Sequence, residues 1–178
     1  MGGILKARRL AYLAFIWLVN VVALRLPGNV LRVGVLRLCG ARVGAGTRVE
    51  RGVKVDFPWR LRIGAASTIN PGVYLDCRGA AIHVGDLVDI SSEAIVYTLT
   101  HDVHGLEFDV RSGAVELADS VWICARAIVL PGSVIGRGSV VAANSVIKGH
   151  VSDHQLWQGN PAVFKKDLPA GRGSARRK

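Results

Sequence analysis

A six-residue period through the middle of the chain limits its possible folds more than any other feature. From Val43 onward an aliphatic residue recurs at this spacing, and the residue after it is often small. Such repeats are typical of a β-helix, in which each repeat is a short strand plus a corner and three repeats complete one coil. The pattern predicts about five coils of a triangular prism with the aliphatic side chains stacked inside. These side chains are Val43, Val49, Val55, Ile63, Ile69, Leu75, Val84, Ile90, Val96, Leu117, Ile123, Val129, Ile135, Val141 and Ile147.

The repeat is interrupted where loops are expected to leave the prism. It slips slightly at residues 57–60 and 77–81 and much further between Val96 and Leu117. The largest excursion, predicted over residues 98–115, contains Thr100-His101-Asp102 and His104. Long loops in a regular solenoid are often functional, and an imidazole can act as a general base near neutral pH. We predict an active-site loop here, with a solvated or structural His101 as the alternative.

Positive charge is concentrated at the two ends of the chain. The net charge is +10, and residues 1–40 contain six Lys or Arg and no acid, while residues 165–178 contain six and only Asp167. A nucleic-acid-binding protein usually carries a basic stripe on its folded surface, so no nucleic acid partner is expected. Basic ends beside an apolar segment fit an anionic membrane surface, or they are plain solvated ends.

The segment Leu10–Leu24 is apolar except for Asn20. As a helix it would be about 22 Å long, shorter than a bilayer core of about 30 Å, so a spanning helix is not favoured. A signal peptide competes with this interpretation, although Arg25 counts against a cleavage site before it. Asn29 is expected to cap a second helix over residues 30–38, with Arg32 and Arg37 on its polar side.

We therefore predict three parts. Residues 1–40 form a helical segment, either packed on the main domain or half-sunk in a membrane face. Residues 41–149 form the β-helix, and residues 150–178 form a C-terminal cap and basic tail. The chain has three cysteines, Cys39, Cys77 and Cys124, without metal or redox spacing, which predicts reduced thiols.

Residues 43–162 resemble the hexapeptide-repeat acyltransferases, which include the maltose, galactoside and nodulation-factor acetyltransferases. The likeness is nearest to the branch that O-acetylates capsule, exopolysaccharide and lipopolysaccharide sugars. The matching segments are Ile69-Asn70-Pro71-Gly72-Val73, Val84-Gly85-Asp86, Thr100-His101-Asp102, Val121-Trp122-Ile123, Val129-Leu130-Pro131-Gly132, Ile135-Gly136-Arg137-Gly138 and Gly159-Asn160-Pro161-Ala162.

The resemblance implies an all-β fold, a single-stranded left-handed parallel β-helix, and a homotrimer with the active site between two neighbouring prisms. It implies acetyl-CoA or another acyl-CoA as co-substrate, a carbohydrate acceptor, no metal and no acyl-enzyme. It places the protein in the cytoplasm, where a peripheral contact of the N-terminal segment with the inner membrane is also open.

The resemblance also assigns site residues. His101 matches the catalytic histidine, which takes a proton from a sugar hydroxyl as that oxygen attacks the acyl thioester. Asn70 matches an acceptor-site asparagine. Asp76, Asp102 and His104 are further acceptor-binding candidates beside it; Asp102 could instead orient the imidazole, and a surface role is the alternative for His104. The coenzyme-binding candidates are Trp122, Ala125, Ala143, Lys148, Asn160, Pro161, Lys165 and Lys166; each lysine could equally be solvated surface.

The chain departs from the family at Cys124-Ala125, where many relatives carry Gly-Ser. The family's serine helps to hold the developing oxyanion, so only a backbone N–H would remain for that task here. Loss of such a side-chain donor can cost about 2.7–4 kcal/mol. We interpret Cys124 as a buried small hydrophobe rather than a nucleophile.

Three other functions remain open. A γ-carbonic-anhydrase-like zinc enzyme needs three converging histidines; His83, His101 and His104 are available, but their spacing does not match that family. A non-catalytic β-helix scaffold is disfavoured by the retained His101 and Trp122. An N-acetyltransferase acting on an amino sugar is excluded by nothing in the sequence.

Overall fold

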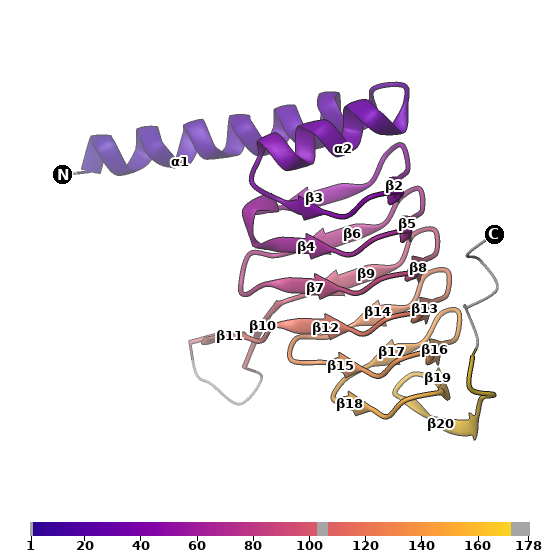
Figure 1. The fold of residues 1–178 in the computed structure, drawn as a ribbon. Helices are drawn as coiled ribbons and strands as arrows, with labels where there is room; N and C mark the ends of the chain where they lie inside the picture. The colour runs from indigo at the N-terminus through magenta and orange to yellow at the C-terminus, as the bar shows by residue number, and fades with distance from the viewer. Residues whose placement is uncertain (1, 103–106, 172–178) are drawn as a thin grey trace.

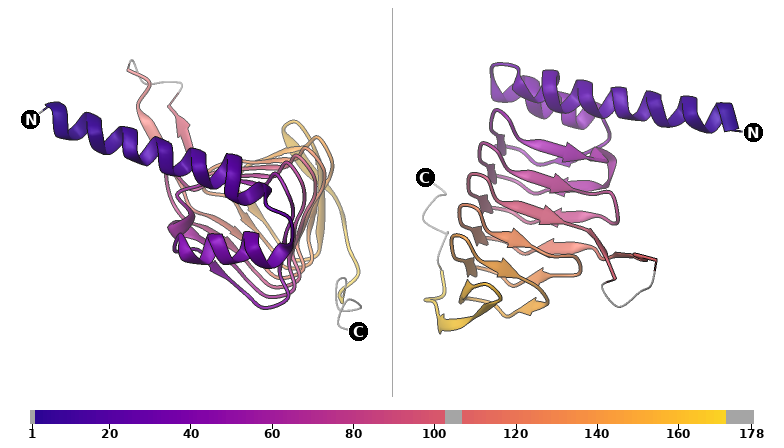
Figure 2. Two further views of the ribbon diagram at one scale, coloured as in Figure 1. Left: turned by 90° about the horizontal axis from the view of Figure 1, so that it is seen from above. Right: turned by 180° about the vertical axis from the view of Figure 1, so that it is seen from behind.

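The chain folds as a left-handed parallel β-helix whose N-terminal end is covered by helices (Figure 1). The structure is a computed structural model that describes residues 2–102 and 107–171, with side chains from residue 10 onward. The strands make five complete coils and part of a sixth, in agreement with the predicted fold class. Seen along the prism axis, the coils superimpose as a three-sided tube (Figure 2).

Three parallel sheets form the faces of the prism. Sheet 1 contains β1 (Arg42–Val43), β4 (Leu61–Ile63), β7 (Ile82–Val84), β12 (Val115–Leu117), β15 (Val134–Ile135) and β18 (His150–Val151). Sheet 2 contains β2 (Arg48–Val49), β5 (Thr68–Ile69), β8 (Asp89–Ile90), β13 (Trp122–Ile123), β16 (Val140–Val141), β19 (Gln155–Gly159) and β20 (Ala162–Asp167). Sheet 3 contains β3 (Lys54–Asp56), β6 (Tyr74–Asp76), β9 (Ile95–Tyr97), β14 (Ile128–Val129) and β17 (Val146–Ile147). We call the bend between sheets 2 and 3 the second corner, and the bend from sheet 3 to the next coil the third corner.

The interior of the prism is filled as the repeat predicted. All the aliphatic positions named above are buried, with exposed fractions from 0 to 8%. The small residue after each of them is explained by the spacing of the coils. A Cβ atom built on Gly64 would lie 2.6 Å from the carbonyl carbon of Gly85 in the next coil. A side chain cannot occupy that space unless the backbone of the next coil moves.

The three interruptions of the six-residue repeat all lie at the third corner. At each of them the chain leaves the regular coil, as predicted. The first is the short 3₁₀ helix η3 (Pro58–Arg60), and the second lies between β6 and β7. The third is an antiparallel hairpin of β10 (Leu99–His101) and β11 (Val110–Ser112), which projects from the prism before the chain re-enters at β12 (Figure 1). At the other end of the chain, β19 and β20 form a hairpin that closes sheet 2.

Four consecutive helical segments cover the first coil: α1 (Gly2–Trp17), the π-helix η1 (Leu18–Val22), the 3₁₀ helix η2 (Ala23–Arg25) and α2 (Asn29–Leu38). Side chains from these segments bond to the unpaired edge of each sheet. The bonds are Asn20 Nδ2 to the Val55 carbonyl (3.1 Å), the Val55 amide to Asn20 Oδ1 (2.8 Å), the Val49 amide to Asn29 Oδ1 (2.8 Å), Arg32 Nε to the Val49 carbonyl (2.7 Å) and Arg37 Nη2 to the Val43 carbonyl (2.6 Å).

One prediction about α2 is wrong. The N-cap is Gly28, without a side-chain cap bond, because Asn29 turns instead towards β2. Arg32 and Arg37 both bond to strands of the first coil, and Arg32 is only 6% exposed. An unpaired strand edge carries backbone groups that need partners, so these polar side chains face the prism together with the buried Val33 and Leu36. Among the described residues, no helix is both long and apolar enough to span a membrane.

Candidate active site

His101 lies on the projecting hairpin, at the end of β10 and opposite Val110 in the antiparallel register. Its side chain is exposed. The base of the hairpin is fixed by Thr98, which is fully buried and whose hydroxyl donates to the Asp76 carbonyl over 2.7 Å. The same hydroxyl accepts the amides of Gly79 and Ala80, each at 3.1 Å. The histidine therefore extends from a rigid base into open space beside the prism.

A backbone contact holds the His101 ring. Its Nδ1 atom lies 2.7 Å from the carbonyl oxygen of Phe108, and the two rings meet edge to face with centroids 6.5 Å apart. A carbonyl oxygen only accepts, so this bond requires the proton on Nδ1 and leaves the Nε2 lone pair available. This is the tautomer that a general base needs at Nε2.

The other two loop candidates differ in what the structure shows. Asp102 forms an ion pair with Arg111 of β11, which ties the two strands of the hairpin together. His104 lies outside the described residues. The orientation of the His101 imidazole is thus carried by the Phe108 carbonyl, which no sequence pattern indicated.

Asp76, predicted to bind the acceptor, is sealed in an ion pair next to the hairpin. It is fully buried, and its two oxygens accept from Arg78 Nε and Nη2, both at 2.8 Å. Nearby, the Tyr74 hydroxyl donates to Asp56 over 2.7 Å, and burial followed by this bond raises the pKa of Tyr74 far above its usual range. An acceptor at this corner would meet the half-exposed Arg78 guanidinium rather than the Asp76 carboxylate.

A second group of candidates lies on sheet 2 and the second corner. Asn70 Nδ2 donates to Asp89 over 2.9 Å, and the indole N–H of Trp122 donates to Ser91 Oγ over 2.8 Å. Ser91 Oγ is 3.4 Å from Asp89, so one polar chain links Asn70 to Trp122. The indole is 40% exposed and so presents an open aromatic surface.

Ser91 and Asp89 were missed by the sequence analysis. The repeat contained a usable signal, because residues 70 and 91 both follow a strand of sheet 2 and therefore stack in successive coils. That stacking places a polar side chain between Asn70 and the strand that carries Trp122.

Most of the coenzyme candidates gather at the second corner in the C-terminal coils. The Asn144 amide donates to the Ala125 carbonyl over 3.1 Å, which puts Ala125 and Ala143 in neighbouring exposed turns. The Gly159 amide donates to Ser145 Oγ over 3.0 Å, which brings the Asn160-Pro161 turn beside them. This part of the predicted coenzyme site is one continuous surface.

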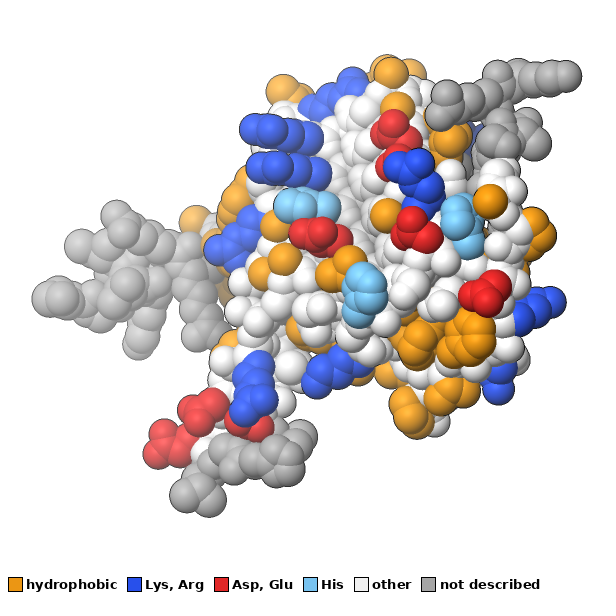
Figure 3. All heavy atoms as spheres, turned by 60° about the horizontal axis from the view of Figure 1, so that its bottom comes forward, with side chains coloured by type: hydrophobic (Ala, Val, Ile, Leu, Met, Phe, Trp, Pro, Cys, Tyr) orange, Lys and Arg blue, Asp and Glu red, His pale blue; other side chains and the backbone are white. Residues whose placement is uncertain are grey.

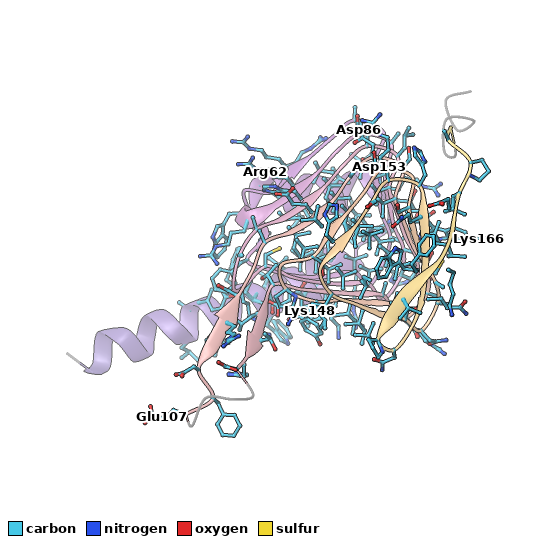
Figure 4. All side chains as sticks on the ribbon, turned by 90° about the horizontal axis from the view of Figure 1, so that it is seen from below. Arg62, Asp86, Glu107, Lys148, Asp153 and Lys166 are labelled. Carbon is cyan, nitrogen blue, oxygen red and sulfur yellow. The ribbon has the colours of Figure 1, made fainter. Side chains whose placement is uncertain are left out.

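The three lysine candidates lie elsewhere, and all are exposed. Lys148 follows β17 at the third corner, on the same side as the hairpin (Figure 4). Lys165 and Lys166 are on β20, the outer strand of sheet 2. The structure therefore does not bring Lys148 together with the other two.

Within one chain the candidates form two separate groups. The His101 group, which includes Lys148 and Arg78, is at the third corner, whereas the Trp122 group, with Asn70, Ala125 and the Asn160 turn, is at the second. The whole of sheet 3 lies between these corners, and Figure 1 shows β10 and β13 on opposite sides of the prism. A single chain cannot place the histidine against the aromatic surface.

The described residues contain no cluster of three or more His, Cys, Asp or Glu side chains that could hold a metal ion. His83 is on β7 in sheet 1 and not on the hairpin that carries His101. The three cysteines form no disulfide with one another, and burial raises the pKa of the Cys77 thiol to about 12.

Comparisons with known proteins agree with this architecture. The bacterial transferase hexapeptide model (six repeats) matches residues 114–149. A protein of Escherichia coli named as a candidate colanic acid biosynthesis acetyltransferase, WcaF, is 29% identical over 136 residues, covering 76% of this chain and 74% of its own. A hexapeptide-repeat acetyltransferase from Vibrio cholerae, solved with acetyl-CoA, superposes with a TM-score of 0.80 at 26% identity, covering 94% of this chain and 91% of its own.

A third relative is AntD from Bacillus cereus, an N-acyltransferase solved as a mutant with dTDP and coenzyme A. It superposes with a TM-score of 0.69 at 26% identity, covering 77% of this chain and 78% of its own. In its fold, its repeat and these relatives, the chain is similar to the hexapeptide-repeat acyltransferases.

Proposed function

We propose that the protein transfers an acyl group, most simply acetyl, from coenzyme A to a hydroxyl of a cell-surface polysaccharide, lipopolysaccharide or precursor sugar in the cytoplasm. The observation that carries this proposal is the bond between His101 Nδ1 and the Phe108 carbonyl. It fixes an exposed imidazole with Nε2 free, as direct transfer without an acyl-enzyme requires.

In this reaction Nε2 of His101 removes the proton of the acceptor hydroxyl while the hydroxyl oxygen attacks the thioester carbonyl carbon. The carbonyl becomes a tetrahedral oxyanion, which collapses as the carbon–sulfur bond breaks. The imidazolium then returns the proton to the departing thiolate, and the products are an O-acyl sugar and free coenzyme A. The histidine ends in its starting state.

The second corner supplies the coenzyme surface. Trp122, Ala125, Ala143 and the Asn160-Pro161 turn line it, and Lys165 and Lys166 follow along β20 as cations for the phosphates. Ala125 is exposed, and its amide N–H donates to no group in the described part of the chain. We assign that N–H to the developing oxyanion, as one backbone donor in place of the family's amide and serine hydroxyl.

A homotrimer completes the site. Threefold symmetry makes each contact heterologous, so the third corner of one subunit can meet the second corner of the next. That arrangement would bring His101 from one chain to Asn70 and Trp122 of its neighbour. The predicted membrane contact of residues 1–40 is not needed for this chemistry and is a separate proposal.

An amino-sugar acceptor is the second candidate, because AntD, named as an N-acyltransferase, shares the fold over most of both chains. An amine attacks the thioester in the same geometry. Assaying matched hydroxyl and amino sugars as acceptors distinguishes the two.

The test is release of coenzyme A thiol from acetyl-CoA in the presence of surface-glycan acceptors. His101→Ala should fold normally and lose about two to four orders of magnitude in kcat, the usual value of a general base. His150→Ala, an exposed histidine on β18, is the matched control and should retain activity. Full activity of His101→Ala would reject the proposal.

A further inference from the structure

The N-terminal end of the prism carries the whole excess of positive charge. Residues 1–62 contain twelve Lys and Arg against two acids, whereas residues 63–178 contain eleven of each. Residues 1–62 make up the helices, the first coil and β4 of the second. By contrast, the C-terminal end turned forward in Figure 3 mixes acidic and basic side chains. The charge asymmetry therefore follows the prism axis.

Several of these cations lack an acidic partner. Arg42 and Arg62 are direct neighbours in the register of sheet 1, and both are exposed. Among the described residues neither forms an ion pair with a carboxylate, and the same holds for Arg51 and Lys54 in the first coil. Like charges side by side on a sheet are unfavourable, so a bound anionic surface would stabilise them.

The same end exposes an aliphatic surface. The side of α2 that faces the first coil carries the buried Val33 and Leu36 as well as Asn29 and Arg32, which bond to that coil. The opposite side is also aliphatic, although a helix packed on a globular domain normally turns a polar side to solvent. Val30, Leu31 and Leu38 on that side are 83, 53 and 89% exposed.

The preceding helix extends this apolar area. Leu10, Leu13 and Trp17 of α1 and Leu18 of η1 are each more than half exposed, and α1 runs beside α2 and beyond the prism (Figure 2). Tyr12 anchors it to Phe57 of the third corner, with ring centroids 4.8 Å apart. Aliphatic side chains with a tryptophan and surrounding cations are the composition of helices that lie in a membrane interface.

We propose that this end of the prism, the outer sides of α1 and α2 with Arg42 and Arg62, binds the surface of an anionic lipid bilayer. A second copy of the same end fits poorly, because each copy would bring the same excess of positive charge. Lipid supplies both an apolar layer for the leucines and phosphates for the arginines, at roughly 1 kcal/mol per cation near the surface.

Bound in this way, the prism axis stands upright on the membrane. The hairpin with His101 leaves the third coil on the side towards which α1 runs (Figure 1). One helix layer of about 10 Å and two strand spacings of about 4.8 Å put the hairpin roughly 20 Å from the lipid surface. The active site would therefore face sugars held close to the membrane.

The test is co-sedimentation of the full chain with phosphatidylcholine vesicles that contain or lack phosphatidylglycerol, at low and high salt. We expect binding only with phosphatidylglycerol, weakened by salt. Leu31→Gln with Leu38→Gln, and separately Arg42→Ser with Arg62→Ser, should each reduce binding by about tenfold or more. Val134→Gln and Arg137→Ser, on the C-terminal coils, are matched controls that should bind like the parent chain.

A parent chain that stays in the supernatant with anionic vesicles overturns the proposal, as does a result in which both double variants bind as well as the parent chain. Light scattering on the same samples tests whether a second copy of the chain covers this surface instead of lipid. In that case the variant with Leu31→Gln and Leu38→Gln would differ from the parent chain in oligomeric state. The co-sedimentation measurement needs no acyl-CoA. A chain that does not bind vesicles would therefore leave the proposed acyl transfer untouched, because the thiol-release assay tests that activity separately.

Discussion

At the scale of single residues, Ala125 is the position at which this chain departs from the pattern that the resemblance to hexapeptide-repeat acyltransferases implies. Ala125 is exposed at the second corner and offers no hydroxyl for a developing oxyanion. We predict that Ala125→Ser raises kcat by about tenfold or more with little change in the KM for acetyl-CoA, because the added donor meets charge that exists only in the transition state.

Ala45→Ser, at an exposed corner of the first coil, is the matched control and should leave kcat unchanged. Thiol-release kinetics at saturating acceptor measure both variants. An unchanged kcat in Ala125→Ser would mean that another group already stabilises the oxyanion.

At the scale of elements, the N-terminal cap depends on a few polar side chains. Asn29 accepts from the Val49 amide over 2.8 Å and donates to the Thr47 carbonyl over 2.9 Å. We predict that Asn29→Ala lowers the free energy of unfolding by about 1–3 kcal/mol, because both backbone groups lose their partner on a half-buried edge. Urea denaturation measures the change, with Arg51→Ala, exposed in the same coil, as the control within about 0.5 kcal/mol. Equal midpoints for the two variants would contradict this account of the cap.

The same cap shows where prediction from sequence succeeded and failed. The aliphatic repeat predicted the coils because each of its positions has the same packing environment. It also predicted a loop over residues 98–115, because an interruption must leave the prism, but it did not predict that this loop is an antiparallel hairpin. The orientation of α2 could not be predicted, because Arg32 looks like a solvent-facing residue until the strand edge beneath it is known. The bond from His101 to the Phe108 carbonyl could not be predicted for a related reason. Any residue at position 108 supplies a backbone carbonyl, so the side-chain pattern does not indicate the contact.

At the scale of the whole molecule, the separation of the two groups of site residues gives the sharpest test of the proposed trimer. His101 is at the third corner and Trp122 is on sheet 2 near the second, with sheet 3 between them. If one site combines His101 of one chain with Asn70 and Trp122 of the next, two inactive variants can repair each other. In a mixed trimer, an interface with His101 from one variant and Trp122 from the other is intact.

We therefore predict that His101→Ala and Trp122→Ala, each strongly impaired alone, regain activity when they are unfolded together and refolded as a mixture. Random assembly leaves about one quarter of the interfaces with both native residues, so recovery should approach about one quarter of the parent activity. Mixing the two variants without unfolding is the control and should restore nothing while the trimers stay intact. If the co-refolded mixture is no more active than its parts, although light scattering shows mixed trimers, then each site lies within a single chain. That result would require a movement of the hairpin that brings His101 across the full width of sheet 3, against the anchoring of its base by the buried Thr98 hydroxyl.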